Sequence, residues 1–362
     1  MKKKVLSMIL ITAMTVSGLV GCGGSSDSYD PSLMGFSNGK VGVSMPAQEL
    51  QRWNQDGSNI EVELEAAGYD VDLQFASNDA ETQISQIESM IDANCELLVI
   101  APVNGDSLSK ALVPAWEKGI PVIAYDRLIN DSDAVSYYAS FDNYGVGTKM
   151  GEYIRDELNL DNAAGPLYME IVSGDTADNN ARFLYNGSMD VLQPYIDEGK
   201  LVVKSGQSDF ESTSIPKWST QTAQDRMDAI LSEYYSDGTE LSAVLCASDS
   251  VALGAENALE ANYAGAWPII TGQDCDIANV KNMIAGKQSM SIFKDTRTLA
   301  LKTVEMVDAI MQGGEPPIND TKTYDNGTGA VPAYLCESEC ADIDNYKELL
   351  IDSGYYTEDD LH

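Results

Sequence analysis

Short apolar runs alternate with amphipathic stretches along most of the chain, a pattern typical of strands and helices that follow one another. An apolar run at 40–45 precedes a helical stretch at 48–67. Further strand-like runs at 69–76, 97–101 and 122–124 are separated by helical segments. At this spacing, strand–helix units form right-handed crossovers in a parallel sheet.

The same pattern restarts after a strand-like run at 135–141. Helices and strands alternate again over 145–285, and a strand at 289–294 and a helix at 296–311 follow. A turn-rich tail contains one more extended segment, 330–335. Two such runs predict an α/β fold with two lobes, each built on a doubly wound parallel sheet.

Charged side chains follow several of these strands. Asp126 and Arg127 come directly after a buried apolar run, and Asp249 and Asp274 follow two strands of the second run. Each of them alone is equally well explained as a surface ion pair or a helix N-cap. Together with Lys294 they place charges at carboxyl ends of strands, where open α/β sheets bind ligands.

Two tryptophans precede helices, Trp53 beside Arg52 and Trp218 beside Lys217. An isolated tryptophan usually serves packing. In a cleft that also holds carboxylates and cations, indole faces suit the C–H faces of a sugar ring, while the charged groups exchange hydrogen bonds with its hydroxyls. This combination favours a sugar ligand.

Composition excludes several functions. The chain has 362 residues, with 57 Asp and Glu against 22 Lys and Arg, and a formal net charge of −35. This charge would repel nucleic acid phosphates. The one histidine is His362, which excludes Ser–His–Asp and Cys–His catalytic sites, whereas glycoside cleavage by paired carboxylates stays open on composition alone.

A glycine-rich segment at 145–151 follows a strand and begins a helix, as a dinucleotide-binding turn does. Its last two glycines lie one residue too far apart for the commonest form of that motif, and we expect the segment to serve helix packing. We therefore expect no cofactor. We also expect no metal site, because the one histidine is the last residue of the sequence.

The N-terminus predicts export. Lysines at 2–4, an apolar run at 5–20 and a small residue before Cys22 are typical of a secretory signal and resemble a bacterial lipobox. We expect residues 1–21 to be a lipoprotein signal peptide and 22–38 a flexible tether, lipid-anchored through Cys22 to the outer face of the cell membrane. The alternative is an ordinary secretory signal in which the cysteine occurs by chance.

Five further cysteines remain. Because five is an odd number, a full disulfide framework is not expected. Cys95, Cys246 and Cys275 lie in or beside apolar runs and are expected to be buried thiols. Cys336 and Cys340 lie in a polar segment and form a possible disulfide.

Several segments, spread from about residue 40 to the C-terminus, resemble the sugar receptors of ABC transporters in the ribose, xylose and galactose group, and most closely the multiple-sugar-binding type represented by ChvE. The segments are 45–53 (MPAQELQRW), 124–129 (AYDRLI), 178–181 (DNNA), 201–207 (LVVKSGQ), 222–228 (TAQDRMD), 272–274 (GQD), 292–297 (IFKDTR) and 319–324 (NDTKTY).

The resemblance implies the type I periplasmic-binding-protein fold, with two doubly wound parallel-sheet lobes joined by three hinge strands. The lobes would comprise residues 39–141 with 292–325, and residues 142–291 with 326–362, and the chain would cross between them near 141–142, 291–292 and 325–327.

The resemblance also implies a set of ligand contacts. Trp53 and Trp218 would enclose the ring, Asp126 and Asp274 would accept hydrogen bonds from hydroxyls, and cations would donate to hydroxyls and the ring oxygen. At Asp249 the sequence differs from the family pattern, and Ser248 is the alternative contact. The full set is Arg52, Trp53, Asp126, Arg127, Asn180, Trp218, Asp249, Asp274 and Lys294.

The implied function is that of a receptor without enzymatic activity. It would capture an aldopentose or aldohexose such as xylose, arabinose, glucose or galactose and deliver it, as a monomer, to an ABC permease. The alternatives are a sensor whose closed form contacts a chemoreceptor or sensor kinase, and a secreted sugar-modifying enzyme.

Overall fold

The computed structural model describes residues 38–361. The expected signal peptide, the tether up to residue 37 and the proposed lipidation site Cys22 lie outside the described residues, as does His362. None of the helices between residues 38 and 361 combines the length and apolar character that crossing a bilayer requires.

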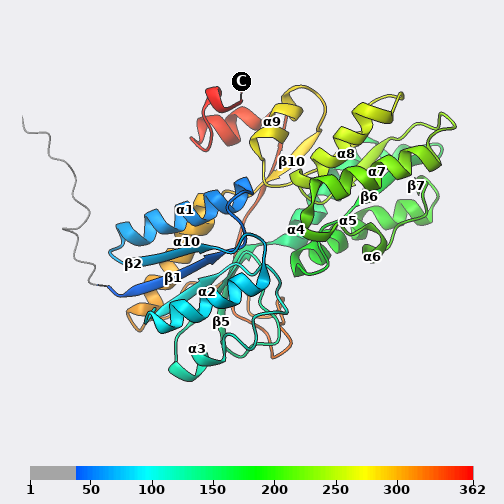
Figure 1. The fold of residues 1–362 in the computed structure, drawn as a ribbon. Helices are drawn as coiled ribbons and strands as arrows, with labels where there is room; N and C mark the ends of the chain where they lie inside the picture. The colour runs from blue at the N-terminus through cyan, green and yellow to red at the C-terminus, as the bar shows by residue number, and fades with distance from the viewer. Residues whose placement is uncertain (1–37, 362) are drawn as a thin grey trace, which may run out of the picture. The chain divides into compact units, whose positions relative to one another are not determined.

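The first lobe contains a sheet of six parallel strands in the order β11-β5-β4-β3-β1-β2 (Figure 1). Helices α1 and α10 pack on one of its faces, and α2 and α3 pack on the other. The elements are β1 (Lys40–Met45), α1 (Gln51–Ala66), β2 (Asp70–Phe75), α2 (Ala80–Asp92), β3 (Leu97–Ile100), α3 (Val113–Lys118), β4 (Val122–Tyr125), β5 (Val135–Phe141), α10 (Thr296–Met311) and β11 (Ala333–Cys336).

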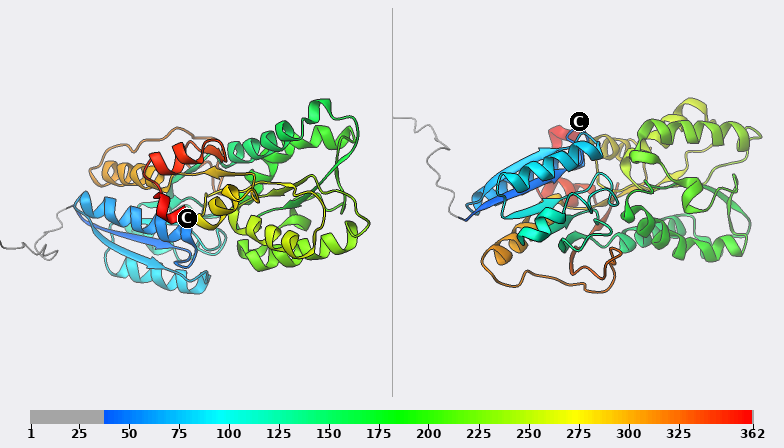
Figure 2. Two further views of the ribbon diagram at one scale, coloured as in Figure 1. Left: turned by 90° about the horizontal axis from the view of Figure 1, so that it is seen from above. Right: turned by 60° about the horizontal axis from the view of Figure 1, so that its bottom comes forward.

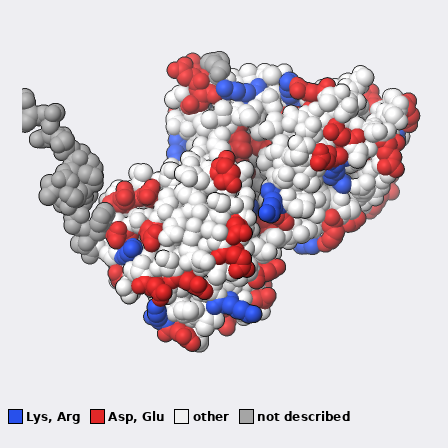
Figure 3. All heavy atoms as spheres, in the orientation of Figure 1, with Lys and Arg blue, Asp and Glu red and all other residues white. Residues whose placement is uncertain are grey.

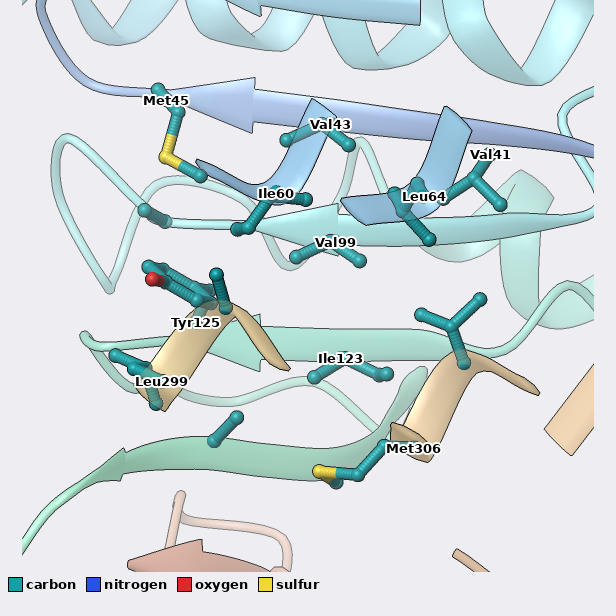
Figure 4. Packing of buried hydrophobic residues seen from close by; sticks show 14 of the residues in the cluster. Val41, Val43, Met45, Ile60, Leu64, Val99, Ile123, Tyr125, Leu299 and Met306 are labelled. Carbon is teal, nitrogen blue, oxygen red and sulfur yellow. The ribbon is translucent and has the colours of Figure 1, made fainter. Parts of the chain in front are cut away.

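The core of this lobe explains why its strands are apolar at successive positions. All residues of β3 and β4 are buried, because helices cover both faces of the sheet. Figure 4 shows one layer of this core, in which Val43 and Val99 of the sheet face Ile60 of α1 and Leu299 of α10.

The second lobe contains four parallel strands in the order β7-β6-β8-β9. Helices α4 and α5 pack on one face and α7 and α8 on the other (Figure 2). The elements are α4 (Asn143–Glu157), η2 (Leu160–Asn162), β6 (Leu167–Val172), α5 (Asn179–Asp197), β7 (Leu201–Val203), α6 (Phe210–Thr213), η3 (Pro216–Trp218), α7 (Thr220–Tyr234), β8 (Ala243–Cys246), α8 (Asp249–Asn262), β9 (Ile269–Ile270) and α9 (Ile277–Ile284).

Three crossings join the lobes. The first runs from β5 into α4, and the second from β10 (Met290–Phe293) into α10. The third runs from β11 to β12 (Glu339–Asp342), which pairs antiparallel with β10. After β12 the chain ends in a π-helical turn, η4 (Lys347–Asp352), and η5 (Glu358–Leu361), which pack with α9.

The third crossing differs from the expected one at 325–327, and residues 326–336 belong with the first lobe rather than the second. Asn326 is tied to the loop after β4, since its side chain donates to Ile129 O and its carbonyl accepts from Asp131 N. The following strand, β11, then pairs in parallel with β5. The chain therefore stays on the first sheet for about ten residues longer.

The possible disulfide between Cys336 and Cys340 is not formed, since both are free thiols. Cys336 ends β11 and packs in the core of the first sheet, whereas Cys340 lies in β12 and packs against the core of the second. The two side chains therefore pack in the cores of different lobes, one before and one after the third crossing. Cys95, Cys246 and Cys275 are buried thiols, as expected.

Two of the glycines at 145–151, Gly147 and Gly151, pack α4 against α5. A Cβ atom at Gly147 would lie 2.0 Å from Leu184 O, and one at Gly187 would lie 2.1 Å from Tyr144 O. The backbones of α4 and α5 therefore approach more closely than any side chain would allow.

This close approach predicts the effect of one added methyl group. Gly147→Ala should destabilise the protein by about 1–3 kcal/mol, because the backbone of α5 must move away. Urea unfolding of the variant measures the loss. Gly165→Ala is the matched control, since a Cβ atom there meets nothing within 4 Å, and an equal effect of both substitutions would contradict the interpretation.

Candidate functional site

A cavity lies between the two lobes at the carboxyl ends of their strands, and we call it the inner cavity. It contains about 570 Å³ of space, counting the part that is open to solvent. This size lies within the usual range of small-molecule sites. Eight of the nine expected ligand contacts line it: Arg52, Trp53, Asp126, Arg127, Asn180, Trp218, Asp274 and Lys294.

Asp249 does not line the inner cavity. Its carboxylate is fully buried behind the site and accepts hydrogen bonds from Asp276 N, Gln288 Nε2 and Ser291 Oγ. A Cβ atom at Gly272 would lie 2.1 Å from this carboxylate, so the neighbouring chain leaves room for it. Asp249 therefore supports the loops of the site, and Ser248, the alternative contact, lines the cavity instead.

Arg52 joins the charged groups of the inner cavity. Its Nη2 lies 2.6 Å from Asp126 Oδ2, its Nη1 3.0 Å from Asp274 Oδ1, and its Nε 2.5 Å from Asp56 Oδ2. Asp126 belongs to the first lobe and Asp274 to the second. Arg52 is only 7% exposed, and a charge this deeply buried needs such partners.

The backbone of Asp126 is held in a left-handed conformation, with φ at 57°. Its carbonyl accepts hydrogen bonds from Tyr138 Oη, Ser140 Oγ and Asn180 Nδ2, the last from the second lobe. These three donors fix a turn that would otherwise be strained and hold the carboxylate in the cavity.

The pKa values of the carboxyl groups of the site are shifted in different directions. Burial would raise the pKa of Asp126, but Arg52, Lys294 and Arg127 lower it further than burial raises it. Burial raises the pKa of Asp56 to about 6, although Arg52 opposes the change. Burial, with the charge of Asp274, raises the pKa of Asp276 to about 7.

The two expected aromatic contacts are placed differently. The Arg127 guanidinium lies 4.9 Å from the ring centroid of Trp53. Trp218 packs against Gly174, where a Cβ atom would lie 2.1 Å from Trp218 Cη2. Both indoles line the cavity, while a ring enclosed between them stays a prediction.

Direct contacts hold the two lobes together beside the cavity. Arg127 Nε lies 2.9 Å from Asp178 Oδ2. Asn180 Nδ2 donates to Asp126 O at 2.7 Å, and Asn179 Nδ2 donates to Asn130 Oδ1 at 2.7 Å. The structure therefore shows the lobes closed on each other.

Six residues that line the inner cavity were not expected. Three of them carry a buried polar atom without a hydrogen-bond partner within residues 38–361: Asn143 Oδ1, Gln273 Oε1 and Asp276 Oδ1. Nε1 of Trp218, an expected contact, is buried and unpaired in the same way. Buried polar atoms are rarely left unpaired, so these atoms indicate a polar ligand. The unexpected residues are Leu50, Asn143, Asp178, Ser250, Gln273 and Asp276.

The positions of some of these residues in the sequence are compatible with a role in the site but also with a purely structural role. Asp178 and Asp276 each precede a helix, where Asp is a common N-cap, and Asp178 does accept a hydrogen bond from Asn180 N. Asn143 is the first residue of α4 and is separated from the end of β5 by one residue at the first crossing. In the part of the chain that the structure describes, no group of His, Cys, Asp and Glu is arranged to hold a metal ion.

Two doubly wound lobes, three crossings and a polar cavity between the lobes define a binding protein of the type I periplasmic class. Residues 41–315 match the periplasmic binding protein domain family. The chain belongs to this family.

Curated relatives and solved structures agree with this assignment. The chain is 47% identical over 322 residues to the multiple sugar-binding periplasmic protein SbpA of Azospirillum brasilense, covering 88% of this chain and 90% of that protein. It is 47% identical over 327 residues to the multiple sugar-binding periplasmic receptor ChvE of Rhizobium radiobacter, covering 89% and 92%.

Among solved structures, an ABC transporter solute-binding protein from Clostridium phytofermentans with bound β-D-glucose is 68% identical, with a TM-score of 0.88, over 89% of this chain and all of that one. A carbohydrate transporter solute-binding protein from Chloroflexus aurantiacus in complex with D-glucose is 31% identical, with a TM-score of 0.80, over 88% of this chain and 97% of that one.

The raised pKa of Asp276 predicts how stability depends on pH. Between about pH 4 and 7 the folded state keeps a proton that the unfolded chain has released, so the free energy of unfolding falls as pH rises through this window. Asp276→Asn removes this contribution. The decrease in the free energy of unfolding between pH 5 and pH 8 should therefore be smaller in the variant by on the order of 1–3 kcal/mol.

Urea unfolding at the two pH values measures the effect. Asp92→Asn, at an exposed position on α2, is the control and should leave the pH dependence as in the original chain. The prediction would be contradicted if the free energy of unfolding of Asp276→Asn fell between pH 5 and pH 8 by as much as that of the original chain.

Proposed function

We propose that the chain is an extracytoplasmic receptor that captures a monosaccharide between its lobes and delivers it to an ABC permease. The observation that carries this proposal is the inner cavity itself. Ion-paired charges, two indoles and four buried polar atoms without partners converge there from both lobes.

The lining suits a polyhydroxylated ring. Asp126 and Asp274 can accept hydrogen bonds from hydroxyls, Arg127 and Lys294 can donate, and Gln273, Asn143 and Ser248 can do either. Charge-assisted hydrogen bonds in a site closed to water contribute roughly 1.5–3 kcal/mol each. A few of them, with indole contacts, support a micromolar dissociation constant, or about −8 kcal/mol.

The ligand class follows from the relatives. Two related structures hold glucose, one of them in a protein 68% identical to this chain, and two curated relatives are described as multiple sugar-binding proteins. We expect an aldopentose or aldohexose, with glucose as the first sugar to test.

The remaining parts of the proposal concern where the receptor acts. A lipid anchor at Cys22 would hold it on the outer face of the cell membrane. The curated relatives named above are described as periplasmic, in keeping with a site of action outside the cytoplasm. We expect a monomer that contacts the permease in its closed form.

Sugar binding would stabilise the closed form because the ligand contacts both lobes at once. In the structure the lobes already contact each other through Arg52, Arg127 and Asn180. These contacts therefore supply the protein part of the closed interface, and the ligand adds to it. A ligand favours closure to the extent that it binds the closed form more tightly than the open one.

The first prediction of this proposal concerns the charged and aromatic contacts. Glucose at a hundred times its dissociation constant should stabilise the folded protein by about 2.7 kcal/mol. Asp126→Ala and Trp53→Ala should abolish this shift in melting temperature while both variants still fold. Arg182→Ala is a control, since Arg182 forms an exposed ion pair with Glu211 away from the cavity. An unchanged response to glucose in both cavity variants would contradict the proposal.

The second prediction concerns the unpaired indole nitrogen. Trp218→Phe keeps an aromatic ring but removes Nε1, and should weaken glucose binding about tenfold if that atom donates to the sugar. Isothermal titration measures the dissociation constant. Trp116→Phe alters a tryptophan that is 60% exposed on α3 and should have no effect. Equal affinities for all three proteins would show that the indole nitrogen makes no contact.

A further inference from the structure

A second cavity adjoins the inner cavity in the same gap between the lobes, and we call it the outer cavity. It contains about 720 Å³ of space, counting the part that is open to solvent. Leu50, Arg127 and Trp218 line both cavities. The outer cavity therefore continues the inner one along shared side chains.

Both lobes contribute to the outer cavity. Asn78 and Asn104 come from the loops after β2 and β3 of the first lobe, and Asp175 and Lys217 come from the second lobe. A ligand in this space would therefore contact both lobes, as a ligand in the inner cavity would. Closure would be coupled to both spaces.

The chemistry of the outer cavity fits a neutral, hydroxylated group. Its walls combine amides, carboxylates and an ammonium with small apolar side chains at Ala80, Val103 and Ala177. Charges of both signs are present, so the space favours neither an anion nor a cation. Amides and carboxylates pair with hydroxyls, and the apolar positions suit C–H groups.

Trp218 lies at the junction of the two cavities and is held firmly. The backbone of Lys217 and Trp218 is left-handed, with φ at 57° and 53°, and Lys217 N donates to Asp175 Oδ2 at 2.7 Å. Gly174 leaves room for the indole, as described above. A fixed indole that borders both spaces can contact two linked rings at once.

From these observations we infer that the receptor also binds disaccharides, with one ring in the inner cavity and the second ring in the outer cavity. The inference rests on the proposed function, since the inner ring occupies the monosaccharide site. It extends the substrate class from monosaccharides to disaccharides that contain glucose.

The full chain is tested by isothermal titration with glucose, cellobiose, maltose, gentiobiose and isomaltose, which cover α and β linkages to two positions. At least one disaccharide is expected to bind within about tenfold of the affinity for glucose and to compete with it. If glucose binds and no disaccharide does, the inference fails and the proposed function stands. If glucose itself does not bind, the proposed function fails.

Variants locate the second ring. Ala177→Phe fills the outer cavity without replacing a residue of the inner one, and should weaken disaccharide binding at least tenfold while glucose affinity stays within about twofold. Thr176→Phe is the matched control, since it adds the same bulk at an exposed neighbouring position that does not line either cavity. It should change neither affinity.

A second substitution guards against a folding defect in the first. Ala80→Phe fills the outer cavity from the first lobe and should have the same selective effect. Disaccharide binding that both filling variants leave unchanged would overturn the inference, as would an equal loss of glucose and disaccharide affinity in both.

Discussion

The buried guanidinium of Arg52 is the constraint on which the site depends. A charge taken out of water is costly unless partners surround it. Arg52 has three carboxylate partners: Asp56 on its own helix, Asp126 after β4 and Asp274 in the second lobe. Asp274 is also 3.0 Å from Lys294, which follows β10. One cation thus fixes the positions of three acids and ties a helix, two strand ends and the second crossing together.

Three of the turns that line the inner cavity are strained, and the strain is offset locally. Asp126, Trp218 and Asp274 all have positive φ, at 57°, 53° and 94°. Two of these turns donate a backbone hydrogen bond to a neighbouring strand, Asp126 N to Ala139 O and Asp274 N to Ile292 O, and Trp218 N donates to Ile215 O within its own turn. Such turns orient side chains into the gap between the lobes. The rigid sheets that bear the turns keep this orientation fixed.

Much of this arrangement could be predicted from the sequence, and the failures have physical causes. Alternating apolar runs identified the strands, and charged residues at strand ends identified Asp126 and Asp274. The pattern could not separate Asp249 from these acids, because an acid that supports a loop and one that faces a ligand follow a strand in the same way. The third crossing was misplaced because Asn326 is bound to the first lobe by contacts distant in sequence. The unpaired atoms of Asn143 and Gln273 become visible only when neighbours are counted in space.

The charge balance of the inner cavity bears on what it can bind. Its three cations, Arg52, Arg127 and Lys294, are each paired with an acid, and Asp276 adds a further carboxyl group. The face of the molecule in Figure 3 is likewise richer in acidic than in basic side chains. An anionic ligand would therefore bring negative charge into a buried site whose lining, within residues 38–361, holds no free cation to receive it, at a cost of several kcal/mol. A neutral sugar meets no such penalty, because its hydroxyls can donate to acids that remain ion-paired. The pairing of these charges thus makes a buried negative charge costly in the inner cavity.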